Sequence, residues 1–192
     1  MLADFYFGRA ENIQLWKGRI DVKMWLYLAG ACMLALNVVS FTTHHYILYG
    51  IQASDGIFLA AALLIFFLLD YMTFEEIHLY TYDLFAERAG FKLGWGCLAF
   101  YAWFYAIPLW STVSLPVHTT PDYLLAVYAL IFFCGWSLSR GANLQKYYFK
   151  KDRTRSFLGI VPKTISDGKQ SLLVNGFWGI SRHINYLGEI MM

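Results

Sequence analysis

Four long apolar runs constrain this chain more than any other feature. They extend from Met24 to Phe41, from Gly56 to Met72, from Gly94 to Val113 and from Tyr123 to Leu138. A helix needs about 20 mostly apolar residues to cross a hydrocarbon core of roughly 30 Å, and each run reaches or approaches that length. We therefore predict an all-α fold, a polytopic transmembrane bundle whose four spanning helices occupy residues 1–138.

The composition agrees with a membrane protein and excludes several other classes. Hydrophobic residues make up 58% of the chain and charged residues 15%, whereas soluble domains average about 25% charged residues. A net charge of +2 is too small for a nucleic-acid binder, so we expect membrane lipids and no nucleic acid as partners, and no obligatory protein partner is evident. Cys32, Cys97 and Cys134 each lie within an apolar run without metal-site spacing, so we expect them to be small buried hydrophobes and expect no metal.

The basic residues lie on alternate sides of the four predicted spans. Lys and Arg occur before the first run, around Arg88 and in the tail after Leu138, whereas the loops 42–55 and 114–122 contain none. The positive-inside rule then predicts that the N-terminus and the basic loops are cytoplasmic. We expect a multi-pass protein of the endoplasmic reticulum in a eukaryote, or of the inner membrane in a bacterium.

The last segment, Ser171 to Met192, is apolar but contains several polar side chains. Polar groups at membrane depth are costly, so they are expected to face a protein-lined cavity. On a continuous helix Arg182, Asn185, Tyr186 and Glu189 would share one face. Arg182 suits a phosphate, while Asn185 and Tyr186 offer donors to a ribose or a nicotinamide-like group. An interfacial helix with a solvated polar face explains the same spacing, and the spacing alone leaves both readings open.

Two further clusters are candidates for chemistry. A basic cluster follows the fourth run and suits either the 2′-phosphate of NADPH or acidic lipid headgroups; by itself it favours lipid anchoring. Its members are Gln145, Lys146, Lys150, Lys151, Arg153 and Arg155. No glycine-rich dinucleotide-binding motif follows a predicted strand, so any nucleotide would not be bound by a Rossmann fold.

An acidic cluster lies at the end of the second run. Its members are Asp70, Tyr71, Glu75, Glu76 and Asp83. A carboxylate such as Asp70 at membrane depth must find a partner or stay protonated, and a protonated acid is a usable proton donor. Tyr71 beside it is the alternative donor.

Several ordered motifs resemble those of the sterol reductase family, which includes the sterol C14, C7 and C24(28) reductases and the reductase-like domain of the lamin B receptor. The signature LLVNGFWGISRHINYLGE is similar to the family's LLxSGWWGxxRHxNYxGD. Upstream elements that match in order are Gly8-Arg9, Asn12, Asp21-Val22-Lys23, Asp70 to Glu76, Asp83, Gly90 to Leu93, Gly96, Arg140, Ala142-Asn143 and Gln145-Lys146. The chain looks most like a Δ14-sterol reductase.

The resemblance implies an enzyme that reduces a sterol double bond with NADPH, by protonation to a tertiary carbocation followed by hydride transfer. It implies that residues 139–192 begin an NADPH-binding region, in which the cofactor would be lined by Lys146, Lys150, Trp178, Arg182, His183, Asn185 and Tyr186. Tyr71, coupled to Asp70, is the implied proton donor, and the sterol is the implied substrate. We expect the Arg, His, Asn and Tyr of the signature to be buried around the nucleotide.

Other interpretations remain open at this stage. A membrane methyltransferase of the isoprenylcysteine type shares an RHPxYxG element, but this chain has Ile184 in place of the proline. Steroid 5α-reductase relatives share a similar element and would keep NADPH while changing the substrate. A non-catalytic sterol-binding membrane protein is the third alternative. Because the pattern stops at Met192 without a helix cap or closing polar tail, we also expect the chain to be a fragment.

Overall fold

The structure is a computed structural model that describes residues 1–11, 13–78, 87–168 and 171–192. Two family-like positions named above, Asn12 and Asp83, lie outside the described residues. The chain divides into two compact units, residues 1–121 and 122–192, and each is treated by itself. The boundary expected from the sequence, 138/139, falls inside the long helix α8 (Asp122–Lys151).

The fold is mostly helical, and the described residues contain four helical segments long and apolar enough to cross a membrane, as predicted. They are Val22–Gln52, Asp55–Thr73, Phe91–Thr112 and Asp122–Lys151. Only 17–28% of the most apolar window of each segment is buried, and side chains such as Leu36, Ile47 and Leu130 are more than 60% exposed. Apolar surface on this scale is not tolerated in water, so these faces suit contact with lipid or with other membrane helices.

The first unit is built around the long helix α2 (Val22–Tyr49). The Asp21 carboxylate caps its N-terminus by accepting hydrogen bonds from the backbone N–H groups of Lys23 and Met24, at 3.0 and 3.1 Å. A short 3₁₀ turn, η1 (Gly50–Gln52), leads to α3 (Asp55–Thr73) and then to α4 (Glu75–His78). The helix α1 (Leu2–Phe7) and the two-residue strands β1 (Gln14–Leu15) and β2 (Ile20–Asp21) precede α2.

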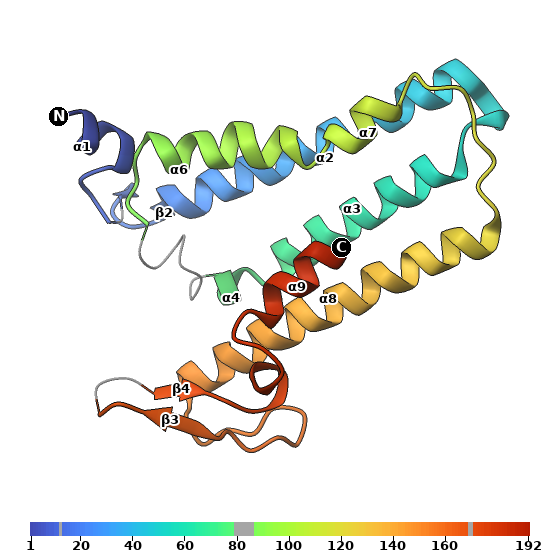
Figure 1. Cartoon of the computed structure of the whole chain (residues 1–192). Coiled ribbons are helices and arrows are strands. Elements are labelled where there is room, and N and C mark those ends of the chain that lie inside the picture. The colour runs from blue at the N-terminus through green and yellow to red at the C-terminus, as the bar shows by residue number, and fades with distance from the viewer. Residues whose placement is uncertain (12, 79–86, 169–170) are drawn as a thin grey trace. The chain divides into compact units, whose positions relative to one another are not determined.

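The third spanning segment is not one regular helix. It consists of α6 (Phe91–Trp95), the π-helix η2 (Gly96–Phe104) and α7 (Ile107–Thr112), and Figure 1 shows it running alongside α2. Pro108 lies in the first turn of α7, where its missing N–H breaks no helical bond. This interruption explains how the segment tolerates the proline that the sequence places within an apolar run.

Close contact between α2 and η2 depends on a glycine and an asparagine. A Cβ on Gly30 would lie 2.3 Å from the Cys97 carbonyl oxygen, so no larger residue fits without moving the helices apart. Asn37 donates from Nδ2 to the Ala102 carbonyl at 2.9 Å. A π-helix departs from the i→i−4 pattern, and a side-chain donor inside the bilayer adds a bond that water does not supply there.

The apolar core of the first unit joins α2, α3 and α7. It consists of Ala31, Leu34, Val38, Ile57, Ala61, Leu68, Ala106 and Leu109. At one end of this core His45 is 1% exposed, with Nδ1 2.7 Å from the Val113 carbonyl and Nε2 accepting from the Ser54 N–H at 3.0 Å. This arrangement requires the neutral tautomer with the proton on Nδ1.

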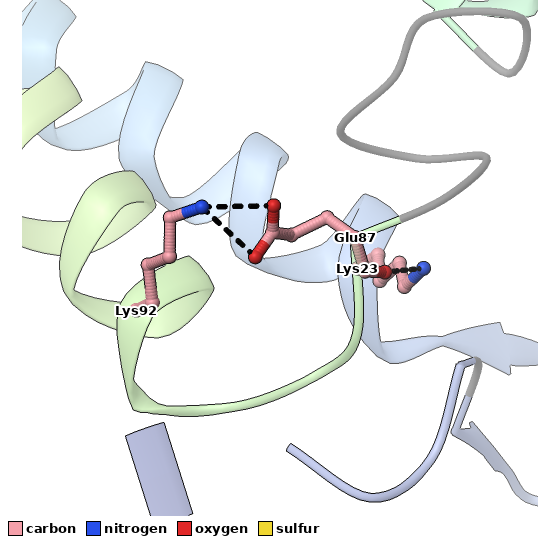
Figure 2. A network of polar contacts seen from close by, with 3 residues as sticks. All are labelled: Lys23, Glu87 and Lys92. Carbon is pink, nitrogen blue, oxygen red and sulfur yellow. Dashed lines mark hydrogen bonds and ion pairs between the residues drawn. The ribbon is translucent and has the colours of Figure 1, made fainter. Parts of the chain in front are cut away.

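Buried Lys23 ties the start of α2 to the segment before α6. Its side chain is 2% exposed, and Nζ donates to the backbone carbonyl of Glu87, whose carboxylate pairs with Lys92 at 3.0 Å (Figure 2). The Glu87 carbonyl gives the buried ammonium group an acceptor, which offsets part of its lost hydration.

The second unit contains α8, a hairpin and two short helical elements. The hairpin pairs β3 (Thr164–Ser166) with β4 (Ser171–Leu173), and the 3₁₀ turn η3 (Gly176–Gly179) leads to α9 (Ile184–Met191). Among the cysteines Cys97 is buried, whereas Cys32 and Cys134 are exposed, so the burial expected for these two is wrong. Both lie on spanning helices, where an apolar thiol can face lipid.

Candidate functional site

A pocket in the first unit lies against Tyr71. It has a volume of about 270 Å³ and is lined by α2, α3 and η2, together with the residues that precede α2 and the start of α4. Its walls are mostly apolar or aromatic, and Arg19, Asp21 and Glu75 provide charge. This combination of an apolar cavity with few polar groups is typical of a ligand site.

The two predicted proton donors differ in their relation to this pocket. Tyr71 is half-buried and is one of the lining residues, whereas Asp70 is buried, 9% exposed, and is not among them. Adjacent residues on a helix point about 100° apart, which explains the separation. The geometry supports Tyr71 over Asp70 as the group that would meet a ligand, and the role of both stays a prediction.

A chain of aromatic contacts connects three residues that line the pocket, Tyr71, Tyr101 and Tyr27. Tyr71 packs on Phe67 with ring centroids 5.1 Å apart, Phe67 stacks on Tyr105 at 6.1 Å, and Tyr105 meets Tyr101 edge-on at 5.5 Å. Tyr101 in turn lies 6.5 Å from Tyr27 of α2. Neither Tyr27 nor Tyr101 was predicted, because both lie inside apolar runs where nothing local separates a lining residue from a lipid-facing one.

In the second unit, α8 holds the signature segment through Gln145. This side chain is 3% exposed; it donates from Nε2 to the Asn175 carbonyl at 3.1 Å, and Oε1 accepts from the Phe177 N–H at 3.0 Å. Asn175 extends the contact, since it accepts from the Lys163 N–H and donates to the Val161 carbonyl. The sequence analysis grouped Gln145 with the basic cluster. In the structure its hydrogen bonds instead hold the backbone of the signature in place.

Lys146 and Trp178 meet on the same surface of the second unit. The Lys146 ammonium lies 5.8 Å from the centre of the Trp178 ring, and the indole N–H donates to the Ala142 carbonyl at 2.9 Å. The structure thus brings together two of the residues predicted for the cofactor. Lys150, one turn along, is exposed at the end of α8.

Two further cations of the basic cluster, Lys151 and Arg155, lie over aromatic rings. The Lys151 ammonium lies 4.5 Å from the ring centre of Tyr147, and the Arg155 guanidinium lies 4.3 Å from that of Tyr148. Within the cluster Asp152 accepts hydrogen bonds from the Thr154 hydroxyl and N–H, which, helped by nearby Arg155, hold the pKa of its carboxyl below the usual value. The cluster therefore presents several cations and one ionised acid.

The signature does not form the continuous helix assumed from its spacing. Helix α9 begins at Ile184 with His183 as its N-cap, so Arg182 lies in the preceding turn and does not share a helical face with Asn185. The phenol ring of Tyr186 stacks on the imidazole of His183 at 5.3 Å with planes only 5° apart. The helical-face interpretation is therefore wrong for Arg182, although Asn185 and Tyr186 do lie on α9.

The expected burial of the signature side chains is also wrong within this unit. Arg182, His183 and Tyr186 are exposed, and Asn185 is half-buried. The residues of α9 that face α8 are instead Ile184 and Gly188, which are buried. A Cβ on Gly188 would lie 2.4 Å from the Gly135 carbonyl oxygen, so the glycine of the signature allows the two helices to touch.

Comparison with known proteins agrees with the architecture. The family model described as "Ergosterol biosynthesis ERG4/ERG24 family" matches residues 1–192. A delta(14)-sterol reductase of Arabidopsis thaliana is 33% identical over 192 residues, covering all of this chain and 50% of the relative. One from Methylotuvimicrobium alcaliphilum is 31% identical over 191 residues, covering 98% of this chain and 44% of the relative.

A 7-dehydrocholesterol reductase of Xenopus laevis is 30% identical over 154 residues, which cover 75% of this chain and 32% of the relative. The chain thus spans half or less of the length of these relatives. Because the family match extends over every residue and the helical membrane architecture agrees with it, the chain belongs to the ERG4/ERG24 family of sterol reductases.

Proposed function

We propose that this chain forms part of an NADPH-dependent sterol reductase that reduces the C14=C15 double bond. The observation that carries the proposal is the position of Tyr71 in an aromatic-walled pocket among membrane-spanning helices of a sterol reductase family member. An apolar ligand can enter such a pocket from the lipid. Relatives named delta(14)-sterol reductase support the choice of double bond.

Tyr71 would donate its proton to one carbon of the double bond, leaving a tertiary carbocation at the other. The aromatic lining residues Trp25, Tyr27 and Tyr101 would exclude water, which would otherwise capture the cation. Asp70 precedes Tyr71 in the sequence and is buried. It would influence proton donation by Tyr71 and would not contact the sterol itself.

The second unit carries a side-chain set that fits a phosphate-bearing dinucleotide. Lys146, Lys150 and Arg182 would bind phosphates, and the rings of Trp178 and Tyr186 offer flat surfaces for stacking, with His183 and Asn185 as further hydrogen-bonding groups. When bound, NADPH supplies the hydride that completes the reduction. The exposure of Arg182, His183 and Tyr186 leaves them accessible to such a ligand.

We further propose that the N-terminus and the basic loops face the cytoplasm. The support is the alternation of Lys- and Arg-bearing segments with segments that contain none. A glycosylation-site scan of the loops 42–55 and 114–122 in a eukaryotic host tests this orientation. Modification of these loops is expected, and modification of the Arg88 segment in their place would reverse the assignment.

The reaction is tested by incubating the full-length protein in lipid nanodiscs with NADPH and Δ14, Δ7 or Δ24(28) sterols, followed by mass spectrometry of the products. We expect an increase of two hydrogens in the Δ14 substrate alone. Reduction of another double bond would refute the choice of C14 but keep the reductase, and the absence of any reduced sterol would overturn the proposal. Transfer of a methyl group from S-adenosylmethionine would point to the methyltransferase alternative.

A further inference from the structure

The pocket described above has a charged end and an apolar end. Arg19 and Asp21 lie just before the first turn of α2, and Glu75 follows the last turn of α3. Leu28 and Ala31 line the same pocket about two to three turns further along α2. Since α2 and α3 belong to two segments long enough to span a bilayer, their adjoining ends mark the membrane boundary. The charged end therefore lies at this boundary, and the apolar end lies at membrane depth.

The charged end offers a hydrogen-bond donor and an acceptor to a ligand. The Asp21 carboxylate is already engaged, because it accepts from the backbone N–H groups of Lys23 and Met24 at 3.0 and 3.1 Å. The side chains of Arg19 and Glu75 are exposed, and neither forms an ion pair with another described residue. Arginine can only donate hydrogen bonds, and a carboxylate can only accept them. A hydroxyl group does both, so a single hydroxyl can use the two side chains together.

Other polar groups fit this end less well. A phosphate or a carboxylate would be repelled by Asp21 and Glu75, and an ammonium group would be repelled by Arg19. A ketone would accept from Arg19 but offer nothing to Glu75. The flat rings of Trp25 and Tyr27 suit a rigid fused-ring body better than the two flexible chains of a phospholipid, whose ordering costs entropy. The pocket therefore suits a rigid apolar body with a hydroxyl at one end.

We propose that Arg19 and Glu75 bind the 3-hydroxyl group of a sterol, whose rings then lie along α2 toward Ala31. The choice of a sterol rests on the proposed function, whereas the place of the hydroxyl rests on the charges of the pocket. Trp25 and Leu28 are 54% and 46% exposed, so the sterol can enter past them from the lipid. Its hydroxyl stays at the membrane boundary throughout, which avoids the cost of carrying a polar group to membrane depth.

This orientation decides which part of the sterol meets Tyr71. Tyr71 precedes Glu75 by four residues, about one helical turn, and both line the pocket. With the hydroxyl held by Glu75, the phenol faces the ring system and not the far end of the sterol side chain. A double bond in the rings is then within reach of the proton donor, and a C24(28) double bond is not.

The test compares sterols that differ only at C3. Binding of a radiolabelled 3β-hydroxysterol, its 3-ketone and its 3-deoxy analogue is measured on the full-length protein in phosphatidylcholine nanodiscs, without NADPH. The natural protein is expected to prefer the hydroxysterol to the 3-deoxy analogue by about tenfold, the lower end of the range for hydrogen bonds to charged groups. Arg19→Met and Glu75→Met each remove one partner, and each variant's preference is expected to fall to about threefold or less.

The 3-ketone separates the roles of the two side chains. Glu75→Met is expected to bind the ketone and the hydroxysterol within about twofold of each other, because only a donor remains. Arg19→Met is expected to bind the ketone no better than the 3-deoxy analogue, because the donor to the ketone is gone. A loss of local structure would weaken all three ligands alike and would not produce this pattern.

Lys17→Met and Glu76→Met are the matched controls, because they make similar changes at exposed neighbours outside the pocket lining and should keep the full preference. Undiminished preference in both Arg19→Met and Glu75→Met would overturn the proposal. So would a natural protein without any preference, including one whose pocket is filled by phospholipid. Since turnover is not measured, a protein that shows the preference but reduces no sterol would contradict the proposed function and not this inference.

Discussion

Gln145 forms two hydrogen bonds with the backbone on either side of Gly176, and one of them joins its side-chain oxygen to the N–H of Phe177 at 3.0 Å. The glutamine comes from a spanning helix and Phe177 from the family signature, 32 residues further along the chain. A contact of this kind fixes the path of the signature without any participation in chemistry.

Replacement of Gln145 by leucine is expected to destabilise the second unit. The change leaves the Asn175 carbonyl and the Phe177 N–H without their partner, and each unsatisfied buried group costs about 1–3 kcal/mol. Thermal unfolding of the detergent-solubilised protein should show a lower midpoint, with an intermediate value for Gln145→Glu, which keeps an acceptor for Phe177. Gln52→Leu, at an exposed position, is the control, and equal midpoints for all variants would contradict the role of Gln145.

Gly188→Ala should separate α8 from α9. The added Cβ would lie 2.4 Å from the Gly135 carbonyl oxygen and 2.5 Å from the Ser139 backbone nitrogen, which backbone atoms cannot relieve without moving. Overpacking of this kind typically costs about 1–3 kcal/mol. Gly94→Ala on α6 is the matched control, because its Cβ would meet nothing within 4 Å. Limited proteolysis of the segment after α8 should increase for Gly188→Ala alone; similar cleavage of both variants would argue against the close packing.

The two lysines around Glu87 should differ in importance. Lys23→Met removes a buried donor to a backbone carbonyl and is expected to lower stability by about 1–3 kcal/mol. Lys92→Met breaks an ion pair in which the lysine side chain is 46% exposed, and pairs of this type contribute about 0–1 kcal/mol. Unfolding midpoints of the two variants in the same detergent test this order, and the reverse order would refute it.

Tyr71→Phe is expected to abolish sterol reduction while leaving NADPH affinity within about twofold of the natural value. The phenylalanine keeps the ring contact with Phe67 but has no proton to donate. Turnover and cofactor binding are measured separately, by product mass spectrometry and by calorimetry. Unchanged turnover would transfer the role of donor to a carboxylate, with Asp70→Asn as the next variant.

The cofactor prediction concerns Lys146 and Arg182. We expect the full-length protein to bind NADPH at least about tenfold more tightly than NADH, a difference of about 1.4 kcal/mol that one charged phosphate contact can supply. The double variant Lys146→Gln, Arg182→Gln should lose NADPH binding altogether. Arg155→Gln, which removes a cation of the same cluster held over Tyr148, is the control and should bind NADPH normally. Equal affinity for both nucleotides would exclude a 2′-phosphate site.

The sequence predicted the four spans because long apolar runs have few alternatives in water or in lipid. It did not predict where the helices end: α2 continues to Tyr49 and α8 to Lys151, since a helix extends through polar interfacial residues that a hydropathy pattern excludes. The π-helix η2 was also missed. It packs against Gly30 and Asn37 of α2, and the local sequence does not indicate these contacts.

Prediction of the site was less complete for a related reason. Charged residues such as Lys146 stand out in an apolar sequence, so the basic surface was found. Tyr101 and Gln145 were missed as a pocket residue and a positioning residue. Their roles are defined by residues far along the chain: Tyr27 is 74 residues from Tyr101, and Asn175 and Phe177 are 30 and 32 residues from Gln145. The same limitation applies to Arg182, whose place before α9 depends on where that helix starts.

The π-helical turns of η2 contain more residues than α-helical turns would, so the direction in which Tyr101 points depends on the number of residues in 96–104 as well as on their identity. Loss of one residue there could be taken up by a return to α-helical winding, which would keep the parts of the third span before and after it in register but redirect the side chains in between. A single-codon deletion in this stretch is therefore expected to change which side chains meet α2, an event that alanine scanning would never sample.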